Sequence, residues 1–344
     1  NGLYGNTSYD LYTYDYASPQ DITIDATGNW WGTVDAPTIS TQIYDNVNNT
    51  GRSPSVDFGG YLDAWQGNPV GTLSLAGVVG TGTVLANDAT YEVLGNLIVP
   101  PGETLTVPSG VTLKFVAGGA SLAWVKGELL VEGTQASPVV FSSGQGTPAA
   151  NDWRGIYVAS TATRVVIDHA EIRHADIGIE FASNALVDTA ACDTFCVRNS
   201  VLEDNGEGMR VIQASPLIQS NLIQNNQTNG IYLNVSDSVI DGNTIQNNGA
   251  SSSGIRILHA SDPVITNNLI TGQGYGIYIR LDGYSRTLAN NSHPEIHGNG
   301  LYGNTSYDLY TYDYASPQDI TIDATGNWWG TVDAPTISTQ IYDN

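Results

Sequence analysis

The sequence predicts an all-β fold, a parallel β-helix (β-solenoid) whose turns stack along one axis. Short segments of the form Gly-apolar-x-apolar recur at intervals of 22 to 32 residues, and asparagines recur in register with them. No segment of useful length combines the apolar period of a helix with helix caps. Because each strand of a parallel β-helix pairs with the equivalent strand one turn later, similar strands at a regular interval are its expected signature.

Side chains alternate along each of these strands, so the third residue of the Gly-apolar-x-apolar segment should point outward. Stacking the turns would place Glu180 beside Arg210. It would also place Arg256 between Tyr232 and Tyr278, and cation–π contacts of that kind contribute about 0.5–1 kcal/mol each at exposed sites. Such a column either joins the turns to one another or offers an aromatic platform to sugar rings or to another filament. In turn order, the predicted outward residues are Tyr157, Glu180, Arg210, Tyr232, Arg256, Tyr278 and Tyr310.

Asparagines are expected at the corners between strands. Asn tolerates left-handed backbone geometry, and its amide can bond to the asparagines of the turns above and below. A second polar set, which begins at Asp204, stands five residues further along each turn. The predicted structural asparagines are Asn199, Asn221, Asn243, Asn268 and Asn299.

Residues 1–46 and 299–344 are identical, at an offset of 298 residues. A chance match of this length is not credible, so we expect tandem units of 298 residues. Residues 1–66 would then be the C-terminal coils and closing segment of a preceding unit, 67–81 a linker, and 82–344 the β-helix of the next unit. Tandem arrays of this kind are typical of a fibre, a stalk or a surface coat before they suggest a catalyst.

Composition and charge limit the classes of partner that the protein could bind. Asp and Glu outnumber Lys and Arg by 34 to 11, giving a net charge of −23, which argues against nucleic acid as a partner. No apolar run approaches the roughly 18 residues of a membrane span, so no membrane insertion is expected within this segment. No cofactor and no metal site are expected, although the acidic surface could hold calcium loosely. Cys192 and Cys196 could close a small disulfide loop, which would suit an oxidising compartment, or remain free thiols.

The ends of the predicted β-helix carry a family resemblance. The Asn-rich turns that finish with Thr325-Gly-Asn-Trp-Trp-Gly330 resemble the close of a right-handed parallel β-helix repeat domain of secreted and cell-surface proteins, in the pectate-lyase-like superfamily. The stretch from Gly110-Val-Thr-Leu-Lys-Phe115 to Asp152-Trp-Arg-Gly-Ile156 resembles the opening of such a domain. The resemblance implies right-handed winding and an extracellular or cell-surface location. It is specific for fold and not for function, since the superfamily includes pectate lyases, phage tailspikes, autotransporter passengers and surface repeats.

The weak candidates for catalysis are Asp168, His169 and Arg173. An Asp, a His and an Arg on neighbouring coils could perform acid–base chemistry on a polysaccharide. The alternative is a set of surface ion pairs. A lyase of the superfamily would be expected to hold calcium on several aspartates in register, and no such column is visible. We therefore expect no catalytic residues and no enzyme, with a polysaccharide lyase or glycosidase as the alternative.

Tyrosines and tryptophans near the two identical ends are candidates for contact and for capping. Tyr310, Tyr312 and Tyr314 alternate along one strand and should all point outward, as should their copies Tyr12, Tyr14 and Tyr16. Such a patch would serve self-association or glycan binding, unless a loop covers it. Trp328 and Trp329, and their copies Trp30 and Trp31, are expected to cap the last coil of a unit, one of each pair pointing inward and the other covering the outer edge.

The sequence thus predicts a structural extracellular repeat protein that forms a filament, stalk or surface coat. Its first partner would be itself, end to end or laterally, and glycans would be the second class of partner. The alternative is a polysaccharide-binding or polysaccharide-cleaving β-helix, an adhesin or a lyase or hydrolase.

Overall fold

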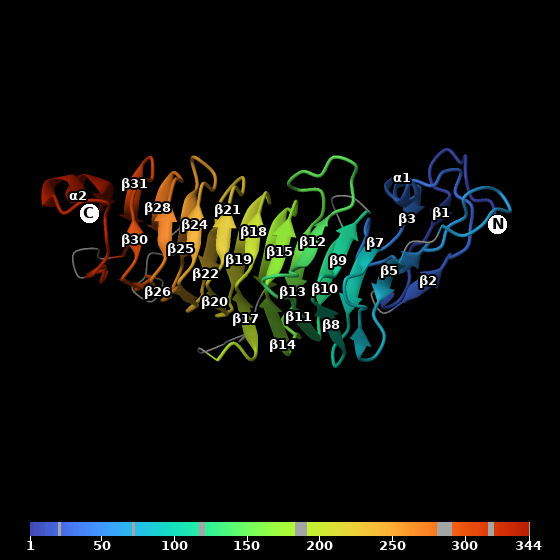
Figure 1. Cartoon of the computed structure of the whole chain (residues 1–344), viewed down its shortest axis with the longest axis horizontal. Helices are drawn as coiled ribbons and strands as arrows, with labels where there is room; N and C mark the ends of the chain where they lie inside the picture. The colour runs from blue at the N-terminus through green and yellow to red at the C-terminus, as the bar shows by residue number, and fades with distance from the viewer. Residues whose placement is uncertain are drawn as a thin grey trace.

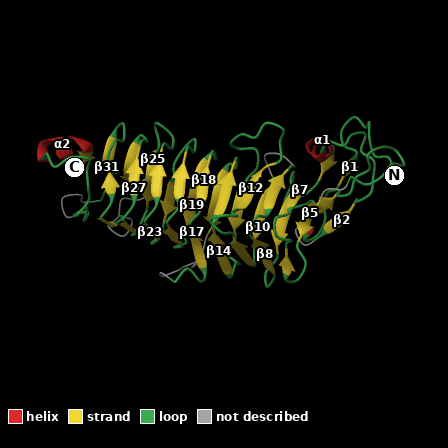
Figure 2. Ribbon diagram, in the orientation of Figure 1, coloured by secondary structure: helices red, strands yellow, loops and turns green. Residues whose placement is uncertain are grey.

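The computed structural model describes residues 1–19, 22–70, 73–116, 121–182, 191–280, 291–315 and 320–343. The molecule is elongated, with its strands lying side by side along the long axis and its termini at opposite ends (Figure 1). Strands dominate, and the two helices lie near the two ends (Figure 2). The strands form a 19-stranded and a nine-stranded sheet, plus two sheets of two strands each. All pairings between these strands are parallel, which confirms the predicted β-helix.

Three strands complete most turns, and we call the faces they form the first, second and third face, in chain order. The first face is the nine-stranded sheet of β6 (Thr83–Val84), β8 (Thr104–Pro108), β11 (Glu128–Glu132), β14 (Arg164–Asp168), β17 (Phe195–Arg198), β20 (Leu217–Gln219), β23 (Val239–Asp241), β26 (Val264–Thr266) and β29 (Glu295–His297). The second face contains β9 (Thr112–Phe115), β12 (Val139–Ser143), β15 (Ala170–Arg173), β18 (Val201–Glu203), β21 (Leu222–Gln224), β24 (Thr244–Gln246), β27 (Leu269–Thr271) and β30 (Gly300–Leu301).

The third face joins the second face in the 19-stranded sheet. The long strand β7 connects them, because its first half pairs with β9 and its second half with β10. The strands of the third face are β5 (Leu73–Val78), β7 (Thr90–Val99), β10 (Leu122–Val125), β13 (Gly155–Val158), β16 (Ile177–Ala182), β19 (Glu207–Ile212), β22 (Ile231–Asn234), β25 (Ser253–Leu258), β28 (Tyr275–Arg280), β31 (Tyr307–Tyr312) and β32 (Ile341–Tyr342).

The core consists of columns of apolar side chains that point inward from the three faces. Parallel pairing in register stacks equivalent residues, and three successive turns repeat isoleucine in each face. Burying such a side chain contributes about 1.5–3 kcal/mol. In earlier turns of the third face, other apolar side chains, such as Met209 and Phe181, occupy the buried positions. The buried isoleucines of the three successive turns are Ile218, Ile240 and Ile265 on the first face, Ile223, Ile245 and Ile270 on the second, and Ile231, Ile255 and Ile277 on the third.

Two ladders of buried amides follow the corners on either side of the second face. In the ladder before it, the Oδ1 atom of each asparagine accepts the backbone N–H of the equivalent residue one turn earlier, at 2.8–3.0 Å. This ladder consists of Ser200, Asn221, Asn243, Asn268, Asn299 and Asn327. The ladder after it consists of Asn205, Asn226, Asn248, Gln273 and Asn304.

The prediction that Asn199 belongs to the ladder is wrong by one position. Val201 pairs with Leu222, so Ser200 and not Asn199 stands below Asn221. Asn199 is exposed with φ +52°, and its amide donates to Asp168. For the same reason Asn205, and not Asp204, begins the other ladder.

The N-terminal segment builds a second, smaller core from β1 (Leu11–Tyr12), β2 (Thr23–Asp25), α1 (Ala36–Thr41), β3 (Ile43–Tyr44) and β4 (Ser55–Asp57). A linker was predicted over 67–81, and for Leu73–Val78 that prediction is wrong. These residues form β5, which pairs with β7, and Ala76 packs against the smaller core. Residues 71 and 72 lie outside the described part of the chain. At the other end, α2 (Ala334–Gln340) precedes β32.

Candidate functional site

The outward column of the third face is the most distinctive surface feature. The strand register aligns Tyr232 with Arg256, Arg256 with Tyr278, and Tyr278 with Tyr310, as the sequence spacing suggests. Trp124 precedes this run, and Tyr342 follows it. The complete column is Trp124, Tyr157, Glu180, Arg210, Tyr232, Arg256, Tyr278, Tyr310 and Tyr342.

Members of this column present their flat faces to one another along the axis. The Tyr278 and Tyr310 rings stack with centroids 4.9 Å apart and planes 14° apart, and Tyr310 stacks on Tyr342 at 4.7 Å and 20°. The Arg256 guanidinium lies 5.4 Å from the centroid of the Tyr278 ring, and that of Arg210 lies 5.7 Å from the Tyr232 centroid. Contact with the neighbouring turn therefore occupies much of the π surface that a sugar would need.

In the charged part of the column, Arg210 forms its ion pair with a residue other than the expected Glu180. Arg210 and Glu180 are aligned across neighbouring strands, but Arg210 Nε donates to Glu207 Oε2 at 2.7 Å. Glu207 is buried and also accepts from Asn229 at 2.9 Å. Burial, which outweighs the positive charges of Arg210 and Arg154, raises the pKa of Glu180. Sequence reasoning missed Glu207, because it lies just before the recurrent Gly-apolar-x-apolar pattern and carries no motif of its own.

An open depression of about 430 Å³ lies over this region, lined by Glu207, Arg210, Tyr232 and Arg256 together with Ile212, Thr228 and Asn229. Its mixture of a carboxylate, guanidinium groups and one aromatic ring suits a polar ligand. Three side chains of the outward column, Arg210, Tyr232 and Arg256, line this depression.

The tyrosine patch at the C-terminal end is smaller than predicted. Tyr310 and Tyr312 point outward, and the Arg280 guanidinium lies 5.7 Å from the Tyr312 centroid. The prediction that Tyr314 points outward is wrong, because this side chain is 8% exposed and its hydroxyl donates to the Ser292 carbonyl at 2.9 Å. Asp313, with φ +68°, interrupts the strand alternation just before it.

The N-terminal copy of the same sequence differs in exposure. Tyr12, Tyr14 and Tyr16 are all exposed, whereas Tyr314, the equivalent of Tyr16, is buried. Tyr12 stacks on Tyr44 at 4.6 Å and 26°, as Tyr310 does on Tyr342. The local stacking is thus reproduced, and the neighbouring turns decide which ring is covered.

The tryptophan pair divides as expected, with Trp329 packed against the core and Trp328 half exposed. The interpretation as a terminal cap is wrong for the N-terminal copy. There Trp31 is 2% exposed and packs edge-on against Phe58, with ring centroids 6.2 Å apart. The core continues past Trp31, so this residue is an internal layer.

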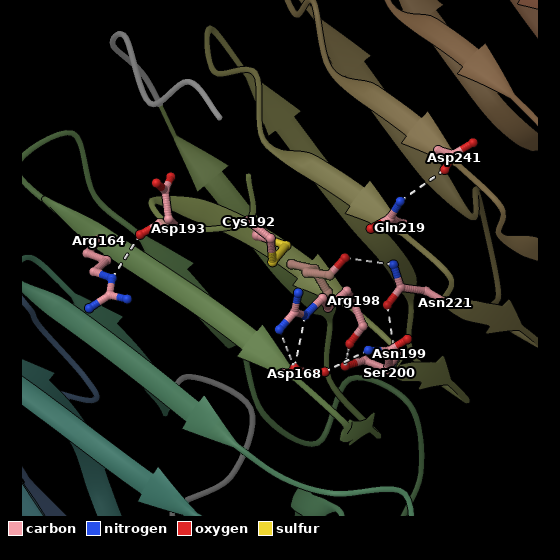
Figure 3. The surroundings of a disulfide bond; sticks show 12 residues. Arg164, Asp168, Cys192, Asp193, Arg198, Asn199, Ser200, Gln219, Asn221 and Asp241 are labelled. Atoms are coloured by element: carbon pink, nitrogen blue, oxygen red, sulfur yellow. Dashed lines mark hydrogen bonds and ion pairs between the residues drawn. A yellow bond between two sulfur atoms is a disulfide. The ribbon is translucent and has the colours of Figure 1, made fainter. Parts of the chain in front are cut away.

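The structure does not bring the three catalytic candidates together. Asp168 and His169 stand at the end of β14 on the first face, whereas Arg173 projects from β15 on the second. Asp168 binds Arg198 at 2.8 Å and accepts from Asn199 at 2.9 Å (Figure 3). The His169 Nδ1 atom also lies 2.7 Å from Asp168 Oδ1. Burial alone would raise the pKa of Asp168, but hydrogen bonds from Asn199 and Arg198 prevail and lower it.

Arg173 is equally committed to structural contacts, since its Nη2 lies 2.9 Å from both Glu171 and Glu203. A carboxylate with a lowered pKa is a poor general acid, and an arginine held between two glutamates is a poor base. The geometry therefore matches the surface ion-pair interpretation of Asp168, His169 and Arg173.

Cys196, in β17, forms a disulfide with Cys192 just before that strand, with a Cα–Cα distance of 5.0 Å (Figure 3). Arg164 on the adjacent β14 donates to the Asp193 carbonyl inside this loop at 2.9 Å. A structural disulfide of this kind is typical of an oxidising compartment.

Within the described ranges, no group of three or more His, Cys, Asp and Glu residues is placed to hold a metal ion. The same residues contain no helix with the length and apolar character needed to span a membrane.

The β-helix region matches a known protein family. The family described as periplasmic copper-binding protein (NosD) matches residues 124–334, which span most of the three-faced β-helix. The match agrees with the right-handed parallel β-helix expected from the resemblance. No curated protein and no solved structure matches the chain.

Proposed function

The chain belongs to the family described as periplasmic copper-binding protein (NosD), and from this premise we propose that it is a non-catalytic structural rod of the cell envelope. The disulfide between Cys192 and Cys196 supports a location outside the reducing cytoplasm. In this role the stacked turns supply stiffness and length, and the outward column joins turn to turn. A filament, a stalk or a surface coat would each use the rod in this way.

The observation that carries the proposal is that polar and aromatic side chains make their contacts along the axis, with the neighbouring turns. Tyr278, Tyr310 and Arg256 present their flat faces to the next turn rather than to solvent. The buried amides of Asn221 and Asn243 likewise bond along the axis. Interactions of this kind strengthen cohesion between turns, which a rod requires and a catalyst does not.

Copper does not fit the residues of this chain. Soft sulfur ligands favour Cu(I), but the single methionine, Met209, is fully buried in the core and both cysteines are in the disulfide. Of the five histidines, His169, His293 and His297 each lie beside an aspartate, and His174 shares a hydrogen bond with the Ser142 hydroxyl. In the part of the chain that the structure describes, no group of three or more His, Cys, Asp and Glu residues is placed to hold a metal ion. We therefore assign no step of the function to copper.

Removal of one whole turn tests the rod directly. Leu222 pairs with Thr244, so deletion of residues 222–243 joins Asn221 to Thr244 and keeps every strand in register. The deleted chain should fold, and spin labels at Glu132 and Asp262 should approach by about 4.8 Å, one strand spacing. A deletion that abolishes the β-sheet circular dichroism, or an unchanged label distance, would contradict the rod.

Turnover assays test the absence of catalysis. Incubation with acidic and neutral polysaccharides should release no new unsaturated or reducing ends. Turnover that disappears in Asp168→Ala or Arg173→Ala would replace the structural proposal with an enzymatic one.

Glycan binding is the second candidate, and the depression beside Tyr232 is the observation that favours it. Glycan-array binding that is lost in Tyr232→Ala and kept in Tyr157→Ala would support this adhesive role. If no glycan on the array binds, the structural role remains as the single proposed function.

A further inference from the structure

A serine and a histidine lie in hydrogen-bond contact on the outer side of the second face. Ser142 points outward from β12, and its Oγ atom lies 2.9 Å from the Nδ1 atom of His174, which directly follows β15. Both side chains are half-buried, so a small reagent can reach them. A serine hydroxyl is a weak nucleophile by itself, and an adjacent imidazole that accepts its proton is a common means of activating it.

The backbone at the corner after β15 holds the histidine in place. His174 adopts the left-handed conformation, with φ +66°. Its N–H donates to the Asp204 carbonyl at 3.2 Å, and its carbonyl accepts the N–H of Asp152 at 3.0 Å. In later turns the same corner carries Asp204, Asn225 and Asn247, with φ +54° or +55°. Asp, Asn and His all tolerate this conformation, and of the three the histidine supplies a neutral base.

The contact between Ser142 and the histidine is separate from the contacts that join the turns. In the same outward column, Arg173 lies 2.9 Å from Glu203, and the Gln224 amide donates to Glu203 at 2.7 Å. These side chains bond along the axis from one turn to the next. The Ser142 hydroxyl instead turns sideways, toward the corner that carries His174. The rod therefore does not need this hydrogen bond for its cohesion.

The charges around the histidine suit it to the role of a base. Burial lowers the pKa of His174 and prevails over Asp204 and Asp152, which raise it. Arg173 and Glu203 have smaller and opposite effects. The ring is therefore neutral at neutral pH and can accept a proton. The two aspartates favour the imidazolium that forms when it does so.

A lysine stands beside the serine on the neighbouring turn. Lys114 on β9 is the aligned partner of Ser142 on the adjacent parallel strand, about 4.8 Å away, and its side chain is exposed. Its flexible stem allows the ammonium group to approach an oxygen that becomes negatively charged. On the other side of the serine, Arg173 is held between Glu171 and Glu203. Lys114 is therefore the cation better placed for this task.

We propose that Ser142 is an acylation site, which takes one acyl group from an activated ester or thioester. His174 removes the hydroxyl proton as the bond between Oγ and the acyl carbon forms, and Lys114 stabilises the charge on the carbonyl oxygen. The carbon–oxygen or carbon–sulfur bond of the donor then breaks, and the proton passes from His174 to the leaving group. The step involves no oxidation or reduction. It goes beyond the proposed structural role, because it gives the rod a point of covalent attachment without turnover.

Acetylation of the full chain by p-nitrophenyl acetate tests the site. Mass spectrometry with peptide fragmentation measures the rate at which each serine gains an acetyl group. Ser109 is the internal control, because it is also half-buried but follows β8 on the first face, away from His174. A positioned general base contributes about 10²–10⁴-fold, so Ser142 should react at least about 100 times faster than Ser109.

Substitutions and pH assign the roles. His174→Asn should keep the fold, because Asn225 and Asn247 hold the same corner in later turns, and circular dichroism checks this. The variant should lose the rate advantage of Ser142 over Ser109, and Lys114→Met should lower the Ser142 rate as well. In the unchanged chain the Ser142 rate should rise with pH as His174 loses its proton, with a midpoint below the ordinary value of about 6.5.

A fast Ser142 rate with this midpoint, lost in His174→Asn, supports the proposal. Equal rates at Ser142 and Ser109 in the unchanged chain overturn it, as does a Ser142 rate that a folded His174→Asn variant retains. If that variant fails to fold, the pH profile of the unchanged chain decides, because a rate that follows hydroxide concentration without a midpoint also overturns the proposal. Label distances and polysaccharide turnover are measured separately, so the structural role and the acylation site can each fail alone.

Discussion

Replacement of Asn243 by alanine should destabilise the rod strongly, because this side chain serves several buried partners at once. Its Oδ1 accepts the backbone N–H of Asn221 at 2.9 Å, and its Nδ2 donates to the Ile218 carbonyl at 2.9 Å. Alanine leaves both backbone groups without these bonds, while the Asn221 amide keeps its bond to the Val197 carbonyl. A buried polar group left unsatisfied costs about 1–3 kcal/mol, so the variant should lose about 2–6 kcal/mol of unfolding free energy.

Urea denaturation followed by circular dichroism measures this loss, and hydrogen exchange at the Asn221 amide locates it. Gln246→Ala is the matched control. Gln246 lies in the same turn and its amide donates to Gln224 at 2.8 Å, but both side chains are half-buried and water can replace that bond. A loss below about 1 kcal/mol for Asn243→Ala, or one equal to that of Gln246→Ala, would refute the argument.

Two further predictions use the identical ends as internal controls. Burial raises the pKa of Asp45 to about 6. The folded state then binds this proton more tightly than the unfolded state, where the pKa is about 4, so stability should fall as pH rises from about 4 to about 6, by about 3 kcal/mol. Urea titrations across that range should show this contribution to the slope lost in Asp45→Asn and kept in Asp343→Asn, whose side chain is exposed. Equal slopes in the two variants would contradict the assignment. Tyr314→Ala should lower the free energy of unfolding by about 3–5 kcal/mol, whereas Tyr16→Ala should lower it by less than about 0.5 kcal/mol. Urea denaturation measures both losses. Similar losses in the two variants would show that burial does not distinguish the copies.

Sequence spacing was sufficient to predict the β-helix and the order of the outward column. Alternation within each strand and a regular interval between strands together determine which side chains stack, and Tyr232, Arg256 and Tyr278 needed no further information. The axial direction of their contacts could also be anticipated, since strand spacing leaves little room between stacked rings.

Other features depended on information that spacing does not contain. Asn199 and Asn221 are the same residue type, but one adopts left-handed backbone at a corner and the other bonds within the buried ladder. Asparagine suits both positions, so its identity could not decide the register by itself. Tyr16 and Tyr314 have identical sequence neighbours, and only the turn that carries Ser292 buries one of them.

The repetition of isoleucine along each face also affects how the chain reaches its native register. A strand that contains Ile231, Ile255 or Ile277 would find nearly equivalent neighbours after slipping by one full turn, so misaligned intermediates should act as kinetic traps. Unlike residues remove this ambiguity, notably Met209 within the same column and Gln273 among the asparagines. These irregular positions give individual turns a distinguishable identity during folding.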